Sequence, residues 1–169
     1  YPIRFRPVLK ETLWGGDTLR ERFGKKAKAG AKIGESWEIC GMPGSGSVVV
    51  NGFLKGNTLE EIAEVYMDEL LGESVYSKYG IEFPLLIKFI DAADKLSIQV
   101  HPDDRLASER HDAWGKTEMW YVLDAKPGAV IHTGFRRKTT KEEYLEYLSG
   151  RKLADLVNET PVSAGDVFF

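Results

Sequence analysis

An imidazole and an amide stand two residues apart in the middle of the chain, where they could bind a metal ion. Residues 96–101 (LSIQVH) alternate between apolar and polar side chains. This period is typical of a strand with one buried and one polar face. The polar face of the predicted strand therefore carries Ser97, Gln99 and His101 in a row.

A second alternating run, residues 117–123 (TEMWYVL), adds a carboxylate. If the two predicted strands face the same interior, Glu118 lies near Gln99 and His101. Nitrogen and oxygen ligands without a thiolate suit zinc, and also manganese, iron or nickel. The alternative is structural, with a hydrogen-bonded histidine on one strand and a solvated glutamate on the other. The spacing alone leaves both interpretations open.

Composition narrows the class of protein. The 169 residues predict one domain, or one domain with a small appendage. The formal net charge is −3, and charges of both signs are mixed along the chain. This balance does not indicate a nucleic-acid or membrane surface. The single Cys40 excludes an internal disulfide framework and agrees with a reducing cytoplasm. No apolar run is long enough to span a bilayer.

The predicted elements that must position these residues are short strands separated by turns and helices. Strands are expected over 33–39 and over 83–90. The second is apolar on both faces, which indicates a central strand, although Lys88 lies within it. Thr58 and Glu61 match a capping box that opens a helix to about residue 71. Before the strand over 33–39 we expect a turn at 13–16 and a helix over 17–23 capped by Asp17. A polar segment is expected over 72–82, and a loop between the two alternating runs. A second capping box at 140–143 predicts a helix to about 148. This pattern indicates an antiparallel β-barrel or sandwich decorated by helices.

Several motifs together resemble a known family. The segments are FPLLIKFIDA (83–92), LSIQVHPDD (96–104) and GKTEMWY (115–121), with LWGG (13–16), IGESWE (33–38) and AGDVF (164–168) in the same order. They are similar to the type I mannose-6-phosphate isomerases, and to the short bacterial branch of these zinc-dependent cupin enzymes. The resemblance spans nearly the whole chain.

The resemblance implies a mainly β protein with a cupin-type antiparallel barrel, or jelly roll, and inserted helices. It implies one catalytic domain over residues 1–169 with a helical insert at about 58–72. The implied reaction interconverts mannose 6-phosphate and fructose 6-phosphate through a metal-assisted enediol proton transfer, with one zinc ion per chain. The expected partner is a small sugar phosphate, not nucleic acid or membrane, for a cytoplasmic monomer or homodimer.

Residue by residue, the resemblance also assigns roles. Lys116 is the first candidate for the proton transfer and Glu35 the alternative base. The remaining assignments are Gln99, His101 and Glu118 as zinc ligands, Lys88 and Ser97 beside the substrate phosphate, and Trp14 at the edge of the site.

Two departures from the family pattern stand out. Gly115 occupies the position where longer members carry a histidine implicated in ring opening. In the family, a fourth zinc ligand, a histidine, and an active-site arginine follow the segment that matches 165–169. The resemblance therefore implies that this chain corresponds to the N-terminal part of a longer member.

Two other functional classes compete with the isomerase. A non-catalytic cupin that binds a metal or a sugar needs the same ligands but no catalytic base. An iron-dependent cupin oxygenase is disfavoured, because it has no use for the phosphate-binding pair Lys88 and Ser97.

Overall fold

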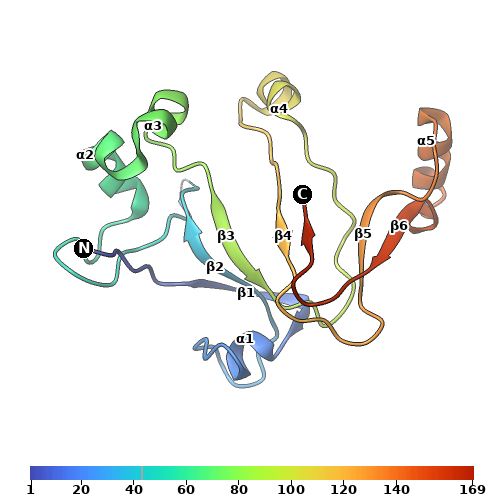
Figure 1. Cartoon of the computed structure of the whole chain (residues 1–169), viewed down its shortest axis with the longest axis horizontal. Coiled ribbons are helices and arrows are strands. Elements are labelled where there is room, and N and C mark those ends of the chain that lie inside the picture. The colour runs from blue at the N-terminus through green and yellow to red at the C-terminus, as the bar shows by residue number, and fades with distance from the viewer. Residues whose placement is uncertain (43) are drawn as a thin grey trace. The chain divides into compact units, whose positions relative to one another are not determined.

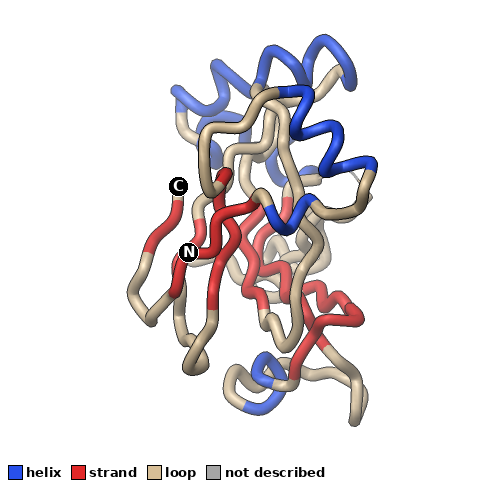
Figure 2. The backbone as a smooth tube through the Cα atoms, turned by 90° about the vertical axis from the view of Figure 1, so that its right-hand side faces the viewer, coloured by secondary structure: helices blue, strands red, loops and turns tan. Residues whose placement is uncertain are grey.

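The computed structural model describes residues 1–42 and 44–169, coloured along the chain in Figure 1. Much of the backbone lies in loops and turns, drawn in tan in Figure 2. The chain divides into two compact units, Tyr1–Leu96 and Ser97–Phe169, and each is described here by itself. The prediction of one catalytic domain over the whole chain stays a prediction.

A three-stranded antiparallel sheet organises the first unit (Figure 1). Its strands are β1 (Val8–Gly16), β2 (Ile33–Cys40) and β3 (Leu86–Ile90), in the order β1-β2-β3. Strand β1 continues through residues 13–16, so the turn predicted there is wrong. Two shifts of register in the pairing of β1 with β2 let the strand absorb the Trp-Gly-Gly sequence without ending.

The strand predicted over 83–90 forms as β3, but it is not central among the described residues. It pairs with β2 alone, and Ile87 is 47% exposed. An apolar run on both faces indicates burial. The number of neighbouring strands depends on pairing, which hydrophobic pattern does not encode.

Helix α2 (Leu59–Leu71) begins at the predicted capping box. The Thr58 hydroxyl accepts the Glu61 N–H at 3.1 Å, and the Glu61 carboxylate accepts the Thr58 N–H at 2.7 Å. The helix buries Leu59 and Ile62 against Val49, which forms the core cluster of this unit. Helix α3 (Glu73–Tyr79) follows directly, in a segment where the sequence predicted only a polar connection.

Helix α1 (Thr18–Glu21) is shorter than predicted, and Asp17 does not cap it. The Asp17 carboxylate pairs instead with Arg20 at 2.5 Å. The Thr18 N–H donates to the carboxylate of Asp91 at 2.6 Å, 73 residues further along the chain. A side chain that is distant in the sequence therefore accepts a backbone N–H of the first helical turn.

The second unit contains two antiparallel strand pairs, two α-helices and one 3-10 turn. Strand β4 pairs with β7, and β5 pairs with β6, all antiparallel. The predicted helix after the second capping box forms as α5, with the Thr140 hydroxyl accepting the Glu143 N–H at 3.2 Å. The bounds are α4 Asp104–His111, β4 Trp120–Tyr121, β5 Val130–Phe135, α5 Lys141–Ser149, a 3-10 turn Leu153–Asp155, β6 Val157–Pro161 and β7 Val167–Phe168.

The two alternating runs around the metal-ligand candidates are mostly not strands. Residues 96–101 form no ladder, and within 117–123 only β4 does. Alternation defines two faces, but a strand also needs a neighbouring backbone for its N–H and C=O groups. Between the runs, α4 replaces the predicted loop, and the Asp103 carboxylate caps it by accepting the Leu106 N–H at 2.8 Å. In the described ranges no helix is long and apolar enough to cross a bilayer.

Replacing Thr58 by alanine should lower the free energy of unfolding by about 1 kcal/mol, because the first turn of α2 loses its hydroxyl acceptor. Chemical denaturation followed by circular dichroism measures the change. Thr58→Ser is the control, since serine keeps the hydroxyl and should stay near the wild type. Equal stability of the alanine and serine variants would contradict the capping role.

Candidate functional site

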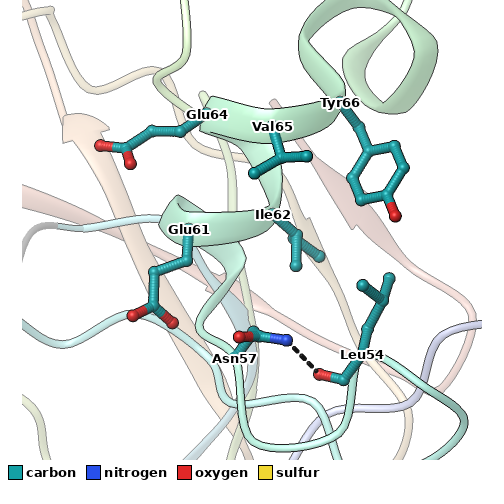
Figure 3. A pocket seen from close by; sticks show the side chains of 7 residues that line it. All are labelled: Leu54, Asn57, Glu61, Ile62, Glu64, Val65 and Tyr66. Atoms are coloured by element: carbon teal, nitrogen blue, oxygen red, sulfur yellow. Dashed lines mark hydrogen bonds between the residues drawn. The ribbon is translucent and has the colours of Figure 1, made fainter.

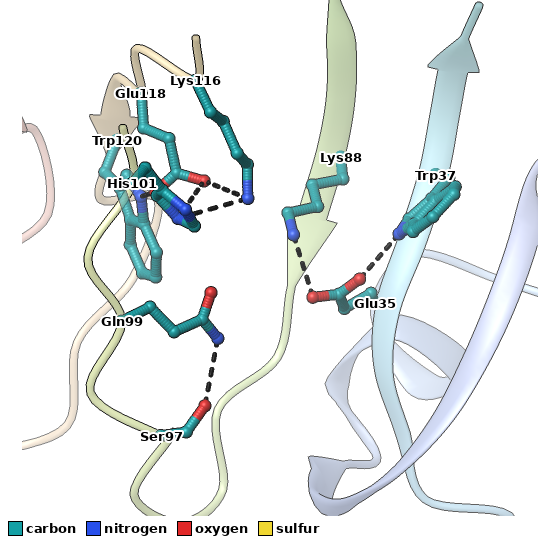
Figure 4. Close-up of polar contacts among 9 residues, drawn as sticks. All are labelled: Glu35, Trp37, Lys88, Ser97, Gln99, His101, Lys116, Glu118 and Trp120. Atoms are coloured by element: carbon teal, nitrogen blue, oxygen red, sulfur yellow. Dashed lines mark hydrogen bonds and ion pairs between the residues drawn. The ribbon is translucent and has the colours of Figure 1, made fainter. Parts of the chain in front are cut away.

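Three polar side chains converge in the second unit (Figure 4). The Lys116 ammonium lies 2.9 Å from Oε1 of Glu118 and 3.3 Å from Nε2 of His101. The same two atoms of His101 and Glu118 are 3.5 Å apart. An imidazole nitrogen and a carboxylate oxygen therefore point at one position, and a positively charged group occupies it.

This arrangement fits a divalent cation by donor type and by convergence, because a lysine ammonium already sits where a cation would bind. The third donor predicted from the sequence, Gln99, donates its amide N–H to the Ser97 hydroxyl at 3.0 Å. In Figure 4 the amide oxygen lies on the side of Gln99 that faces His101. In the described part of the chain, no three His, Cys, Asp or Glu side chains are arranged to hold a metal ion. A site at this place therefore needs the Gln99 amide as its third donor.

The electrostatics keep Glu118 ionised. Burial by itself would raise the pKa of this carboxyl, but the hydrogen bond and the charge of Lys116 outweigh burial. Weaker contributions come from the Trp120 indole, whose Nε1–H lies 3.4 Å from Oε2, and from His101. The net result is a pKa below the ordinary value of a glutamic acid. A metal ligand must be deprotonated, and the Glu118 carboxyl meets this condition at neutral pH.

The loop that presents Lys116 and Glu118 is held against the start of α4 by Gly115. The Gly115 N–H donates to the Asp104 carboxylate at 3.0 Å. A Cβ atom at this glycine would lie 2.5 Å from the backbone carbonyl carbon of Asp103 and from the backbone nitrogen of Asp104. This close approach gives a physical reason for the glycine, where the resemblance would place a histidine in longer relatives.

A second carboxylate with two partners lies in the first unit (Figure 4). Oε1 of Glu35 accepts a hydrogen bond from the Lys88 ammonium at 2.9 Å, and Oε2 accepts the Trp37 indole N–H at 2.6 Å. The Glu35 side chain is 17% exposed and that of Lys88 22%. Directly opposite residues of neighbouring strands share a face, and Trp37 lies opposite Lys88.

The sequence assigned Lys88 to the substrate phosphate, and its ion pair with Glu35 was not foreseen. Lys88 belongs to the first unit and Ser97 to the second. Their shared phosphate contact stays a prediction. Trp14 lies on β1, and its indole packs so closely on Gly34 that a Cβ there would be 2.6 Å from Cζ3 of the indole. This contact places Trp14 beside the backbone that leads into Glu35.

Sequence reasoning missed two contributors, Trp37 and Trp120. Each stands two residues after a candidate glutamate, and each indole N–H is directed at that glutamate. Residues at this spacing lie on the same side of an extended chain. The repeated Glu-x-Trp pattern was therefore the signal that could have identified them.

A shallow pocket beside α2 contains none of the predicted site residues (Figure 3). The lining includes two carboxylates, Glu61 and Glu64, and no Lys, Arg or His among the described residues. A phosphate group would meet only negative charge there. The described lining consists of Leu54, Asn57, Glu61, Ile62, Glu64, Val65 and Tyr66.

Comparisons with known proteins point to one family. Residues 3–145 match the family described as phosphomannose isomerase type I, catalytic domain. The mannose-6-phosphate isomerase of Streptococcus mutans is 40% identical over 168 residues, which are 99% of this chain and 51% of that protein. The chain therefore spans about half the length of the curated relatives it matches.

Solved structures agree. The mannose 6-phosphate isomerase from Bacillus subtilis superposes with a TM-score of 0.83 at 37% identity, covering 99% of this chain and 51% of that one. A mannose 6-phosphate isomerase bound with zinc and yttrium gives a TM-score of 0.54 at 30% identity, covering 63% and 26%. The predicted cupin-type fold with inserted helices is confirmed, although the sheets of the described residues do not close into a barrel.

Replacing Gly115 by alanine should lower the free energy of unfolding by about 1–3 kcal/mol, because the added methyl group overlaps backbone atoms that cannot rotate away. Denaturant unfolding measures the loss. Gly46→Ala is a matched control, since among the described residues its methyl group would have no neighbour closer than 3.8 Å. If the two variants are equally stable, Gly115 is not required for the close contact with α4.

Proposed function

The chain belongs to the family of type I phosphomannose isomerases, and on this premise we propose that it supplies catalytic residues for an aldose-ketose isomerase. The proposed reaction interconverts mannose 6-phosphate and fructose 6-phosphate. The convergence of Lys116, His101 and Glu118 is the observation that carries the proposal, because it joins a metal-ligand pair to a group able to move a proton.

The proposed cofactor is one zinc ion per chain, held by Gln99, His101 and Glu118. Zinc accepts imidazole and carboxylate ligands, and catalytic zinc sites typically keep a position open for water or substrate. The relative solved with zinc and yttrium supports this choice of metal. When bound, the ion supplies positive charge that polarises a substrate oxygen.

The reaction requires a proton to leave C2 of the open-chain aldose and a proton to be delivered to C1. A second proton passes from the C2 hydroxyl oxygen to the C1 oxygen, so that the carbonyl group shifts from C1 to C2. A positioned side chain must take up the first proton and return it. Lys116 is the proposed carrier in its neutral amine form, because its side chain reaches the ligand cluster. Glu35 is the alternative carrier, since a carboxylate held at both oxygens is already oriented.

The remaining assignments concern substrate binding. We assign the phosphate to Lys88 and Ser97, a point charge and a hydroxyl donor that suit an anion. Because Lys88 also pairs with Glu35, phosphate binding would compete for the same ammonium. Trp14 is assigned to the edge of the sugar site. A non-catalytic metal- or sugar-binding module would use the same ligands, and only turnover separates it from the isomerase.

Replacing His101 by alanine should weaken zinc binding at least about tenfold, because one of three protein ligands is lost. Competition with a chromophoric chelator measures the affinity. His111→Ala is the matched control, since His111 is an exposed residue at the end of α4 and should leave zinc affinity unchanged. An unchanged affinity in the His101 variant would exclude it from the ligand set.

Replacing Lys116 by methionine should lower kcat for mannose 6-phosphate isomerisation about a hundredfold or more, because general acid-base catalysis is lost. Fructose 6-phosphate formation followed by NMR measures the rate. The exposed Lys126→Met variant is the control. If the Lys116 variant turns over normally, the carrier is Glu35 or another group. If the unmutated chain binds zinc and sugar phosphate without turnover, the binding-module alternative is favoured.

A further inference from the structure

We propose that Trp37 is a positioning residue for Glu35, and that its indole N–H fixes the orientation of the Glu35 carboxylate. The contact itself is independent of any reaction. Its catalytic consequence rests on the proposed isomerase function with Glu35 as the proton carrier.

The geometry around Glu35 limits the rotation of its carboxylate. The Trp37 Nε1–H donates to Oε2 at 2.6 Å, and the Lys88 ammonium donates to Oε1 at 2.9 Å. The two donors come from different strands, β2 and β3, and each takes a different oxygen. Rotation of the carboxylate would break both bonds. Because hydrogen bonds to a charged group are stronger than those between neutral groups, the orientation is well defined.

The two donors affect the Glu35 carboxylate in different ways. Lys88 carries a positive charge and partly neutralises the carboxylate, and a bound phosphate would compete for it. The indole of Trp37 is neutral and donates a single hydrogen bond at a fixed angle to its ring. Trp37 therefore orients Glu35 without cancelling its charge, and it keeps this role when Lys88 turns toward an anion.

The indole is itself held in place by its neighbours on the sheet. Trp37 lies on the middle strand, opposite Val8 on β1 and Lys88 on β3. The Lys10 ammonium lies 4.4 Å from the centroid of the indole ring, within the range of a cation–π interaction. Lys10 is the strand partner of Glu35 and so shares its face. The paired backbone on both sides and the Lys10 ammonium limit the movement of the Trp37 side chain.

The second unit repeats the arrangement independently. Trp120 follows Glu118 by two residues, its Nε1–H lies 3.4 Å from Oε2, and Lys116 takes Oε1 at 2.9 Å. Both candidate carboxylates therefore have one lysine and one tryptophan as partners, each on its own oxygen. The Trp120 contact is longer and weaker, so the Trp37 contact is the one that carries the inference.

The first experiment reads the contact without any reaction. A ¹H–¹⁵N spectrum of the chain resolves the indole N–H signals, and Trp37→Phe assigns the signal of Trp37 by its loss. In Glu35→Gln, which leaves Trp37 in place, the weaker acceptor should move this signal upfield. The Trp114 indole, in the other unit, is the internal reference and should not move. A Trp37 signal that does not respond to Glu35→Gln overturns the proposal.

The second experiment measures the catalytic consequence. Trp37→Phe keeps an aromatic ring but removes the donor, so kcat should fall about tenfold or more while KM stays within about twofold. Trp114→Phe is the matched control. Lys10→Met removes the cation above the ring but keeps the indole N–H, and it should lower kcat less than Trp37→Phe. A merely structural role would lower the thermal stability of both Trp37→Phe and Lys10→Met without this difference in kcat.

The outcomes separate the two proposals. If the unmutated chain isomerises mannose 6-phosphate and Trp37→Phe leaves kcat unchanged, the catalytic part of the positioning role is overturned and the proposed function stands with Lys116 as the carrier. If the unmutated chain shows no isomerisation while the Trp37 signal responds to Glu35→Gln, the proposed function fails and the positioning contact stands. Should Trp37→Phe not fold, the response of the Trp37 signal in Glu35→Gln decides.

Discussion

The antiparallel register of β2 against its two neighbours is the constraint on which the chemistry of the first unit depends. A carboxylate exposed by only 17% must have polar partners. The register supplies them by placing Trp37 opposite Lys88 and Lys10 opposite Glu35. A shift of one residue would turn these side chains to the other face of the sheet. Glu35 would then lose its Lys88 partner from β3, whereas Trp37, on the same strand as Glu35, would stay beside it.

In the second unit, polar side chains also converge around a carboxylate, but no strand ladder positions them. Residues 96–101 and most of 117–123 form no strand ladder, yet His101, Lys116 and Glu118 still converge. The loop that carries Lys116 and Glu118 is held in place by backbone contacts. The Lys116 N–H donates to the Pro102 carbonyl at 3.1 Å, and Gly115 permits the close approach to α4. A ligand cluster on loops depends on such contacts, so the glycine matters as much as the ligands.

Local signals located two of the helices and missed two others. The capping boxes at Thr58 and Thr140 correctly marked the starts of α2 and α5. Asp103 carried a comparable signal that was not used, so α4 was missed. The candidate ligands His101 and Glu118 were correctly expected to meet, although the strands expected to bring them together were not formed. The family resemblance supplied the remaining roles, and those roles rest on motif matches.

The sequence by itself determined the family, the residue types of the site and the helices whose caps lie within four residues of their partners. Only the tertiary structure decided the partners of Glu35, since Lys88 is 53 residues away, and the cap of α1, since Asp91 lies 73 residues from Thr18. The physical reason is the range of the interactions. A cap or a periodic face is set by neighbours in the chain, whereas an ion pair between strands depends on register and bulges, which the whole sheet determines.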